Sequence, residues 1–190
     1  MSVFDRKVCL HVLYFLYSLI FICSASWSAA LPAEDVQLVM DAQYFQIAKK
    51  MIQEAKSSIH IMMFEMGYYD KYPNTPSNLL IQELINAKKR GVKVEVILEV
   101  KEERDRTAER NRHTGKILSE GGVEVIYDPL FKTTHTKLMV VDGHLTLLGS
   151  TNWTYYALTN NYEASVLIRS KEVAKELIDY FNKVKATGSK

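Results

Sequence analysis

The residues with the clearest chemical potential in this 190-residue chain lie between positions 135 and 163. His135 and Lys137 stand one residue apart in the segment HTKLMVVD, whose apolar run predicts a strand over 137–141. Because side chains alternate between the two faces of a strand, the imidazole and the ammonium group are expected to project from the same side. A nucleophile beside a fixed cation is suited to a phosphate, whose negative charge the cation would offset.

A second group of candidate residues follows a short turn. Asp142 and Gly143 lie between two apolar segments, and both residue types tolerate the positive φ of a tight hairpin. The next strand, expected over 145–148, leads into a GSTN segment that contains Ser150 and Asn152. These two residues share a face if the chain stays extended. Two neighbouring strands would then surround one tetrahedral anion with a nucleophile, a cation and neutral hydrogen-bond donors.

Together these residues form the pattern H-x-K, four residues, D, six residues, G-S-x-N. The pattern resembles the HKD motif of the phospholipase D superfamily. The segments NWT and NYE that follow resemble the small bacterial endonucleases of that superfamily, which carry a single motif. The similarity spans about residues 36–185, one domain of ordinary size. The pattern is met by His135, Lys137, Asp142, Gly149, Ser150 and Asn152.

The resemblance implies a metal-independent phosphodiesterase that needs no cofactor. By analogy with the family, His135 would attack phosphorus and form a phosphohistidine, which water would then release. Lys137 and Asn152 would bind the phosphate oxygens, and Ser150 would add a hydroxyl or backbone donor. Glu163 would accept a hydrogen bond from the His135 ring and so fix its tautomer.

Asp142 is expected to have a structural role despite its place in the motif. It follows His135 by seven residues, an odd separation that puts the two side chains on opposite faces of an unbroken strand. We therefore interpret Asp142 as a turn residue or as an anchor for neighbouring backbone. Gly149 is assigned to the framework of the motif, because it has no side chain to do chemistry.

One motif supplies half of the catalytic pair that the resemblance implies. The superfamily uses two histidines, one as nucleophile and one as the acid that protonates the leaving oxygen. In this sequence only His135 has a lysine two residues later. We therefore expect a homodimer in which both chains present His135 to one shared site. No metal is expected, because Lys137 of each chain would supply the positive charge.

The substrate is less well defined than the reaction. The first hypothesis is a nonspecific endonuclease that hydrolyses DNA or RNA, and the second is a phospholipase D that converts phosphatidyl lipids to phosphatidic acid. A noncatalytic nucleic-acid or membrane-binding module is a third hypothesis, which the intact motif disfavours. Candidate substrate contacts are two tyrosines for base stacking and a basic run for phosphate binding. These residues are Tyr68, Tyr69, Lys88, Lys89 and Arg90.

The elements that must position these residues alternate between helix and strand. Asp41 is expected to cap the first helix, and a charged helix is expected to end near Glu120. The pattern predicts one α/β domain with a mixed β-sheet flanked by helices, similar to the phospholipase D fold. Further helices are expected over 42–55, 77–90 and 171–184, and strands over 59–66, 92–100, 123–127, 137–141, 145–148 and 164–168.

Residues 1–30 are expected to stand apart from the domain formed by residues 31–190. A basic pair, an apolar run over 8–23 and small residues before Leu31 are typical of a signal peptide or an N-terminal membrane anchor. We expect export to the periplasm or the medium, or retention at the membrane through this segment. Both cysteines lie in it, so the domain has no thiolate metal site. Residues 31–190 contain 22 basic and 21 acidic residues, a balance that does not separate nucleic acid from lipid.

Overall fold

The computed structural model describes residues 30–101 and 105–189, and residues 31–190 form one compact unit. The predicted signal or anchor lies, except for Ala30, outside the described residues. The strands are β1 (Asp35–Met40), β2 (Ser58–Met63), β3 (Lys93–Leu98), β4 (Glu124–Tyr127), β5 (Lys137–Val141), β6 (Leu145–Gly149) and β7 (Ala164–Arg169). The helices are α2 (Gln43–Glu54), α3 (Pro76–Lys89), α4 (Arg106–Glu120), α5 (Tyr155–Thr159) and α6 (Lys171–Lys185).

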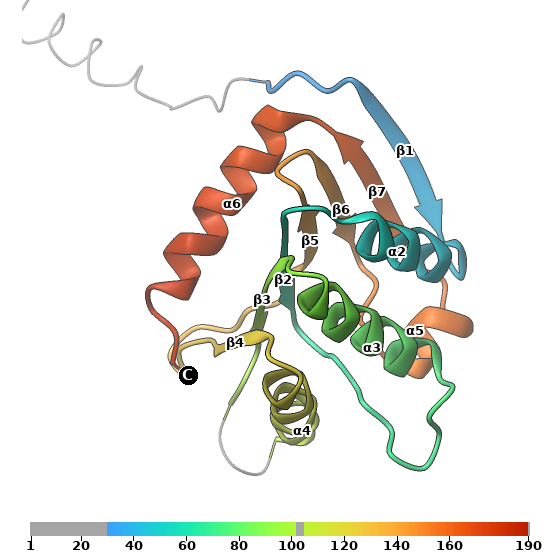
Figure 1. Ribbon diagram of the computed structural model, residues 1–190, viewed down its shortest axis with the longest axis vertical. Coiled ribbons are helices and arrows are strands. Elements are labelled where there is room, and N and C mark those ends of the chain that lie inside the picture. Colours follow the sequence, from blue (N-terminus) through green and yellow to red (C-terminus); the bar gives the residue numbers. More distant parts are fainter. Residues whose placement is uncertain (1–29, 102–104, 190) are drawn as a thin grey trace, which may run out of the picture. The chain divides into compact units, whose positions relative to one another are not determined.

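In the described part of the chain, the strands form one seven-stranded sheet in the order β1-β7-β6-β5-β2-β3-β4 (Figure 1). β2, β3 and β4 run parallel and are joined by crossovers through α3 and α4. The remaining neighbours pair antiparallel, which hairpins and short connections allow. The predicted mixed sheet flanked by helices is confirmed.

The two faces of the sheet carry separate apolar cores. Residues of α2, α3 and α4 pack on one face, together with Met139 and Val141 of β5. Residues of α6 pack on the other face, together with Leu138 and Val140 of β5. Because side chains alternate along β5, Lys137 belongs to the face that carries α2 and α3.

Two elements were not expected from the sequence. Strand β1 lies at the edge of the sheet. Val36 and Leu38 are exposed although they are apolar, and only Val39 is buried, so the strand does not alternate buried apolar with exposed polar residues. Helix α5 has five residues, too few to show a helical period. Asp41 is not the helix cap that we expected, since Ala42 occupies the N-cap position and Asp41 has a φ of 48°.

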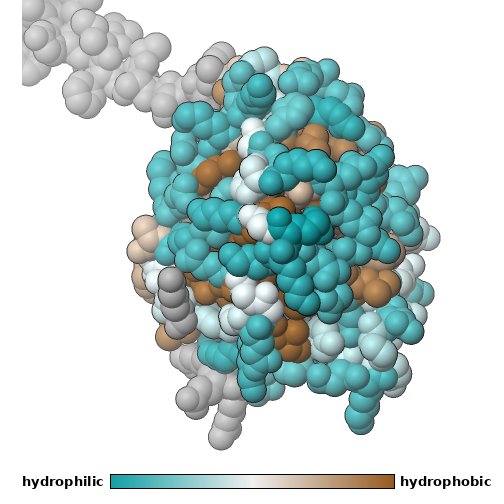
Figure 2. All heavy atoms as spheres, viewed as in Figure 1, coloured by the Kyte–Doolittle hydropathy of each residue, from teal (hydrophilic) through white to brown (hydrophobic). Residues whose placement is uncertain are grey.

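Polar residues cover most of the drawn face of the molecule. Figure 2 shows this face as largely hydrophilic, with apolar residues in small separate patches. None of the helices among residues 30–101 and 105–189 has the length and apolar character needed to cross a bilayer.

Candidate active site

His135 lies two residues before the start of β5 and is exposed to solvent. Its ring packs against Phe64, with the two ring centroids 4.5 Å apart. The preceding loop is held by the buried carboxylate of Asp128, which accepts hydrogen bonds from Thr134 N (2.7 Å) and Val100 N (2.8 Å). The backbone that carries His135 is therefore tied to the end of β3, while its imidazole stays open to a substrate.

Lys137 is the first residue of β5 and is almost fully buried, with 6% of its surface exposed. Its Nζ donates a hydrogen bond of 2.9 Å to the carbonyl of His135 and lies 4.8 Å from the centroid of the Phe64 ring. Burial lowers the pKa of Lys137, and the charges of Glu163 and Glu65 act against that shift. The ammonium group is thus held beside His135 in a partly dry environment, where its charge acts strongly on an anion.

Asn152 reaches this edge of the sheet through its neighbour Trp153. Trp153 N donates to Glu65 O (3.0 Å), and Gly67 N donates to Trp153 O (2.8 Å), so the segment runs beside the residues that follow β2. The amide oxygen Oδ1 of Asn152 is buried without a hydrogen-bond partner in the described part of the chain. An unsatisfied buried polar atom costs about 1–3 kcal/mol. Such a cost is expected of a group that awaits a ligand.

Ser150 and Glu163 are hydrogen-bonded to each other. The Ser150 hydroxyl donates to the Glu163 carboxylate and accepts from Ala164 N at 3.1 Å, while Ser150 N donates to Ala164 O at 3.0 Å. Both donors of Ser150 are therefore used in the β6–β7 connection, and a contact of Ser150 with phosphate stays a prediction.

The Glu163 side chain was expected to contact the His135 ring, and the structure gives it hydrogen-bond partners in the connection between β6 and β7. Among the described residues, its carboxylate receives hydrogen bonds from Ser150 and from Asn161 Nδ2 (3.1 Å). Asp41 fastens its backbone, because Glu163 N donates to Asp41 Oδ1 at 2.8 Å and Asp41 N donates to Glu163 O at 3.0 Å. Glu163 also supplies negative charge near Lys137, and its hydrogen bond with the His135 ring stays a prediction.

Asp142 and Gly149 lie in the framework of the site. Asp142, with a φ of 53°, accepts hydrogen bonds from the backbone of 56–58 and from the Ser57 hydroxyl. Burial raises the pKa of Asp142, but these hydrogen bonds outweigh it and the net pKa is below the ordinary value. A Cβ on Gly149 would lie 2.1 Å from Ser165 Oγ, so only glycine permits this approach of β6 to β7.

The basic run at the end of α3 is not brought to the site. Lys88, Lys89 and Arg90 precede the start of β3, whereas His135 lies beside the end of β2. Because β2 and β3 are parallel, these positions are at opposite ends of the sheet, roughly 17 Å apart along a six-residue strand. The three residues are therefore not next to His135 within one chain, and their contact with substrate stays a prediction. Arg90 donates to Ile52 O at 2.8 Å.

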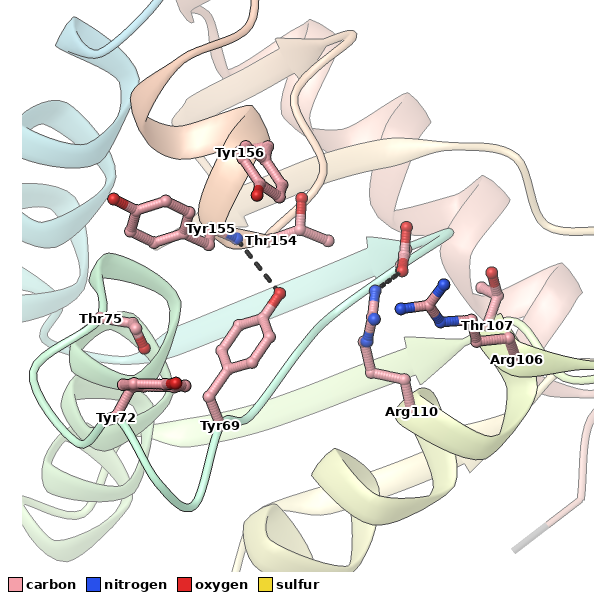
Figure 3. Close-up of a pocket in the computed structure, with 10 residues that line it drawn as sticks. Tyr69, Tyr72, Thr75, Arg106, Thr107, Arg110, Thr154, Tyr155 and Tyr156 are labelled. Atoms are coloured by element: carbon pink, nitrogen blue, oxygen red, sulfur yellow. Dashed lines mark hydrogen bonds and ion pairs between the residues drawn. The ribbon is translucent and has the colours of Figure 1, made fainter.

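The two tyrosines predicted to bind substrate lie in different surroundings. Tyr68 packs against the core of the α2–α3 face and against the His113 ring, and its contact with substrate stays a prediction. Tyr69 lines an open pocket of about 710 Å³ beside the site (Figure 3). The pocket is also lined by Glu65, Tyr72, Thr75, Arg106, Thr107, Arg110, Thr154, Tyr155 and Tyr156.

Sequence reasoning did not assign Phe64 or Glu65 to the site, and it gave Asp41 the role of a helix cap. Phe64 contacts both His135 and Lys137, and Glu65 forms an ion pair with Arg110. These residues come from other elements, so no local spacing connects them with the motif. One sequence signal could have identified Phe64 and Glu65: they directly follow Met63, where the buried strand β2 ends. Among residues 30–101 and 105–189, no group of three or more His, Cys, Asp or Glu residues could hold a metal ion.

The chain is similar to proteins of one family. The family model described as "Cardiolipin synthase, PLD-like domain" matches residues 48–185. A phospholipase D of Rickettsia typhi is 26% identical over 141 residues, which cover 74% of this chain and 62% of that relative. The chain thus spans less than two thirds of the length of this curated relative.

Solved structures agree with this match. The crystal structure of Nuc, a phospholipase D family member from Salmonella typhimurium, is 25% identical with a TM-score of 0.68, covering 81% of this chain and 95% of that chain. NucT from Helicobacter pylori shares the fold, with 17% identity and a TM-score of 0.63 over 82% of this chain and 99% of that one. Since the family model spans most of the chain and the site carries its motif on the same fold, this protein belongs to the phospholipase D superfamily.

Proposed function

We propose that this chain is a metal-independent phosphodiesterase that cleaves nucleic acid through a phosphohistidine intermediate. The observation that carries the proposal is the exposed imidazole of His135 beside the buried ammonium group of Lys137. The Asn152 amide, with an unsatisfied buried oxygen, adds hydrogen-bonding capacity at the same edge of the sheet. This set provides a nucleophile, a cation and a neutral polar group for one phosphate.

The proposed reaction has two steps. A ring nitrogen of His135 attacks phosphorus, so that a P–N bond forms while the P–O bond to the leaving group breaks, and an acid protonates the leaving oxygen. Water then attacks phosphorus and the P–N bond breaks. The proton of the attacking water passes to the group that acted as acid in the first step. Lys137 and Asn152 stabilise the charge on the non-bridging oxygens in both steps.

The acid in this scheme comes from a second copy of the chain. The other histidines in the described part are engaged elsewhere: His60 with Glu95 (3.1 Å), His113 with Asp70 (2.9 Å) and His144 with Glu34 (3.0 Å). We therefore propose a homodimer in which His135 of each chain faces one phosphate. A two-fold axis through the site would achieve this with one surface patch.

Nucleic acid is the favoured substrate, and a phospholipid is the second candidate. The single motif, through which the sequence resembles the small endonucleases of the superfamily, supports nuclease activity. The chain also matches 95% of Nuc, which is described as a phospholipase D family member. The relative described as a phospholipase D supports lipid hydrolysis, but the match covers 62% of its length. Both candidates would use His135 and Lys137.

Cleavage assays in EDTA test the reaction and the substrate together. The purified full chain and its His135→Ala variant would be incubated with single-stranded DNA, duplex DNA, RNA and phosphatidylcholine vesicles. We expect nucleic-acid cleavage by the wild type and none by the variant. Activity lost in EDTA and restored by a divalent ion would contradict the mechanism. Lipid turnover without nucleic-acid cleavage would contradict the proposed substrate.

Mixed dimers test the shared site. Wild-type and His135→Ala chains would be refolded together in known ratios, and the activity measured against the wild-type fraction. If each site needs His135 from both chains, activity follows the square of that fraction. A linear dependence, or full activity in a sedimenting monomer, would show that one chain is sufficient.

Export of the protein is a separate proposal that rests on residues 1–30. The apolar run and the small residues before Leu31 support a cleaved signal peptide or a membrane anchor. N-terminal sequencing of the protein from a bacterial periplasmic fraction would distinguish a chain that starts near Leu31 from an uncleaved one. Retention of the whole chain in the cytosol would refute the proposal.

A further inference from the structure

The pocket of about 710 Å³ lies next to the proposed catalytic residues. Glu65, one of its lining residues, directly follows Phe64, whose ring contacts both His135 and Lys137. Its Thr154 lies two residues after Asn152. A substrate that places its phosphate at His135 therefore has this pocket beside it.

Four tyrosines line one part of the pocket, and the motif accounts for none of them. Tyr69 and Tyr72 come from the loop between β2 and α3, whereas Tyr155 and Tyr156 begin α5 (Figure 3). Tyr155 N donates to the Tyr69 hydroxyl at 3.3 Å, which joins the two segments. The rings of Tyr155 and Tyr156 meet edge to face, with centroids 5.4 Å apart.

The outermost tyrosines are open to solvent in spite of their size. Tyr72 is 66% exposed and Tyr156 is 67% exposed. A large aromatic side chain gains more from burial than from exposure, so open rings around a pocket mark a surface for a ligand.

Two arginines of α4 line the other part of the pocket. Figure 3 shows Arg106 and Arg110 extending from this helix, across the pocket from the labelled tyrosines. Arg110 pairs with Glu65, and its guanidinium lies 5.8 Å from the centroid of the Tyr69 ring. Arg106 is exposed, and its charge is available to a phosphate group.

We propose that this pocket binds an unstacked base of single-stranded nucleic acid next to the cleaved phosphate. The inference rests on the proposed function and extends it to the strandedness of the substrate. Tyrosine rings stack on any base, and a neighbouring arginine contacts the adjacent phosphate, which together make a sequence-tolerant single-strand site. A base in a duplex is already stacked and paired, and must be flipped out before it can enter.

The lining favours a nucleic acid over the acyl chains of a lipid. Hydroxylated aromatic rings, threonines and arginines surround the pocket. Acyl chains would instead be matched by aliphatic side chains without hydroxyl groups. The combination of flat rings with positive charge complements a base and its phosphate.

Binding measurements test the pocket without requiring cleavage. The background is full-length His135→Ala, so that a failure of the proposed chemistry does not affect the result. The dissociation constant for a fluorescent single-stranded DNA would be measured for this background and for the same protein carrying Tyr72→Ala and Tyr156→Ala in addition. We expect a rise of about 5- to 150-fold, the range that stacking of one base supplies. Both side chains are mainly exposed, so the fold should persist.

A matched control is Tyr180→Ala, because Tyr180 is 45% exposed on α6, on the other face of the sheet. This variant should bind like the background. Tyr156→Phe should also keep affinity, because it retains the ring, whereas Tyr156→Leu should lose it. An unchanged dissociation constant in the double variant, or an equal loss in Tyr180→Ala, would refute the base pocket.

Two further substrates sharpen the test. An oligonucleotide that lacks bases should bind the background weakly and should lose little more in the tyrosine variants. Duplex DNA should bind more weakly than the single strand at the same salt concentration. Tighter binding of duplex, or a loss of phosphatidylcholine vesicle binding in the tyrosine variants with no loss for DNA, would contradict the proposal and assign the pocket to another ligand.

Discussion

Two clusters of the same residue types lie on opposite faces of the sheet. The edge cluster comprises His135, Lys137 and Glu163, and the buried cluster comprises His60, Glu95 and Lys185. In the buried cluster, Glu95 is 1% exposed and forms ion pairs with Lys185 and with Lys93 (2.7 Å). The His60 ring packs against Phe181, with centroids 5.2 Å apart.

The two clusters differ in whether their charges are satisfied within the chain. Burial raises the pKa of Glu95, but hydrogen bonds and charges from Lys185 and Lys93 outweigh it and bring the pKa to about 2. In the edge cluster, burial lowers the pKa of Lys137 in spite of nearby carboxylates, and His135 is open to solvent. The same residue types therefore stabilise the fold in one place and remain available to a substrate in the other.

Replacing each histidine by alanine should produce the largest contrast. His135→Ala should lower phosphodiesterase activity at least about 10³-fold, because the nucleophile is removed. His60→Ala should leave activity within about threefold and lower the free energy of unfolding by about 1–3 kcal/mol, since it leaves a gap beside Phe181. Activity assays and urea unfolding of both variants measure the difference. An inactive, stably folded His60→Ala protein would break the comparison.

The lysines should show a similar but smaller separation. Lys137→Met should lower activity about 10²- to 10³-fold, because a charge that stabilises the phosphate oxygens is lost. Its stability should not fall, since burial already disfavours the ammonium group.

Lys185→Met is the matched variant in the buried cluster. It should keep activity but lower the free energy of unfolding by about 1–3 kcal/mol, because Glu95 loses one of its ion pairs. Urea unfolding and steady-state rates test both variants. Equal losses of activity would indicate that the two clusters are coupled.

The pH dependence of stability should show the smallest effect. The pKa of Glu95 is about 2 in the fold, below its ordinary value of 4.5. The unfolded chain therefore binds the proton first as pH falls, and the stabilisation is present above pH 4.5 and lost between 4.5 and about 2. Urea unfolding at several pH values should show that the free energy of unfolding falls more steeply with decreasing pH for the wild type than for Glu95→Gln. Parallel curves would show that Glu95 does not contribute.

Much of the fold could be predicted because its signals are local. The strand β5, the turn at Asp142 and Gly143, and the helix α6 lie close to their predicted ranges. Strand β1 could not be predicted, because its pairing with β7 lies more than 120 residues away in sequence and its apolar residues are largely exposed. The role of Asp41 was wrong for the same reason, since its partner is Glu163.

The sequence by itself determined the motif residues and, through them, the family. The spacing of His135, Lys137 and Asn152 is a property of one short stretch of chain, where strand parity and turn chemistry are local. Only the tertiary structure decided that the donors of Ser150 are already used and that the basic run of α3 lies at the far end of the sheet. It also decided that tyrosines of two segments meet at one pocket. These outcomes depend on which strands become neighbours, and that is set by packing of the whole core rather than by any local pattern.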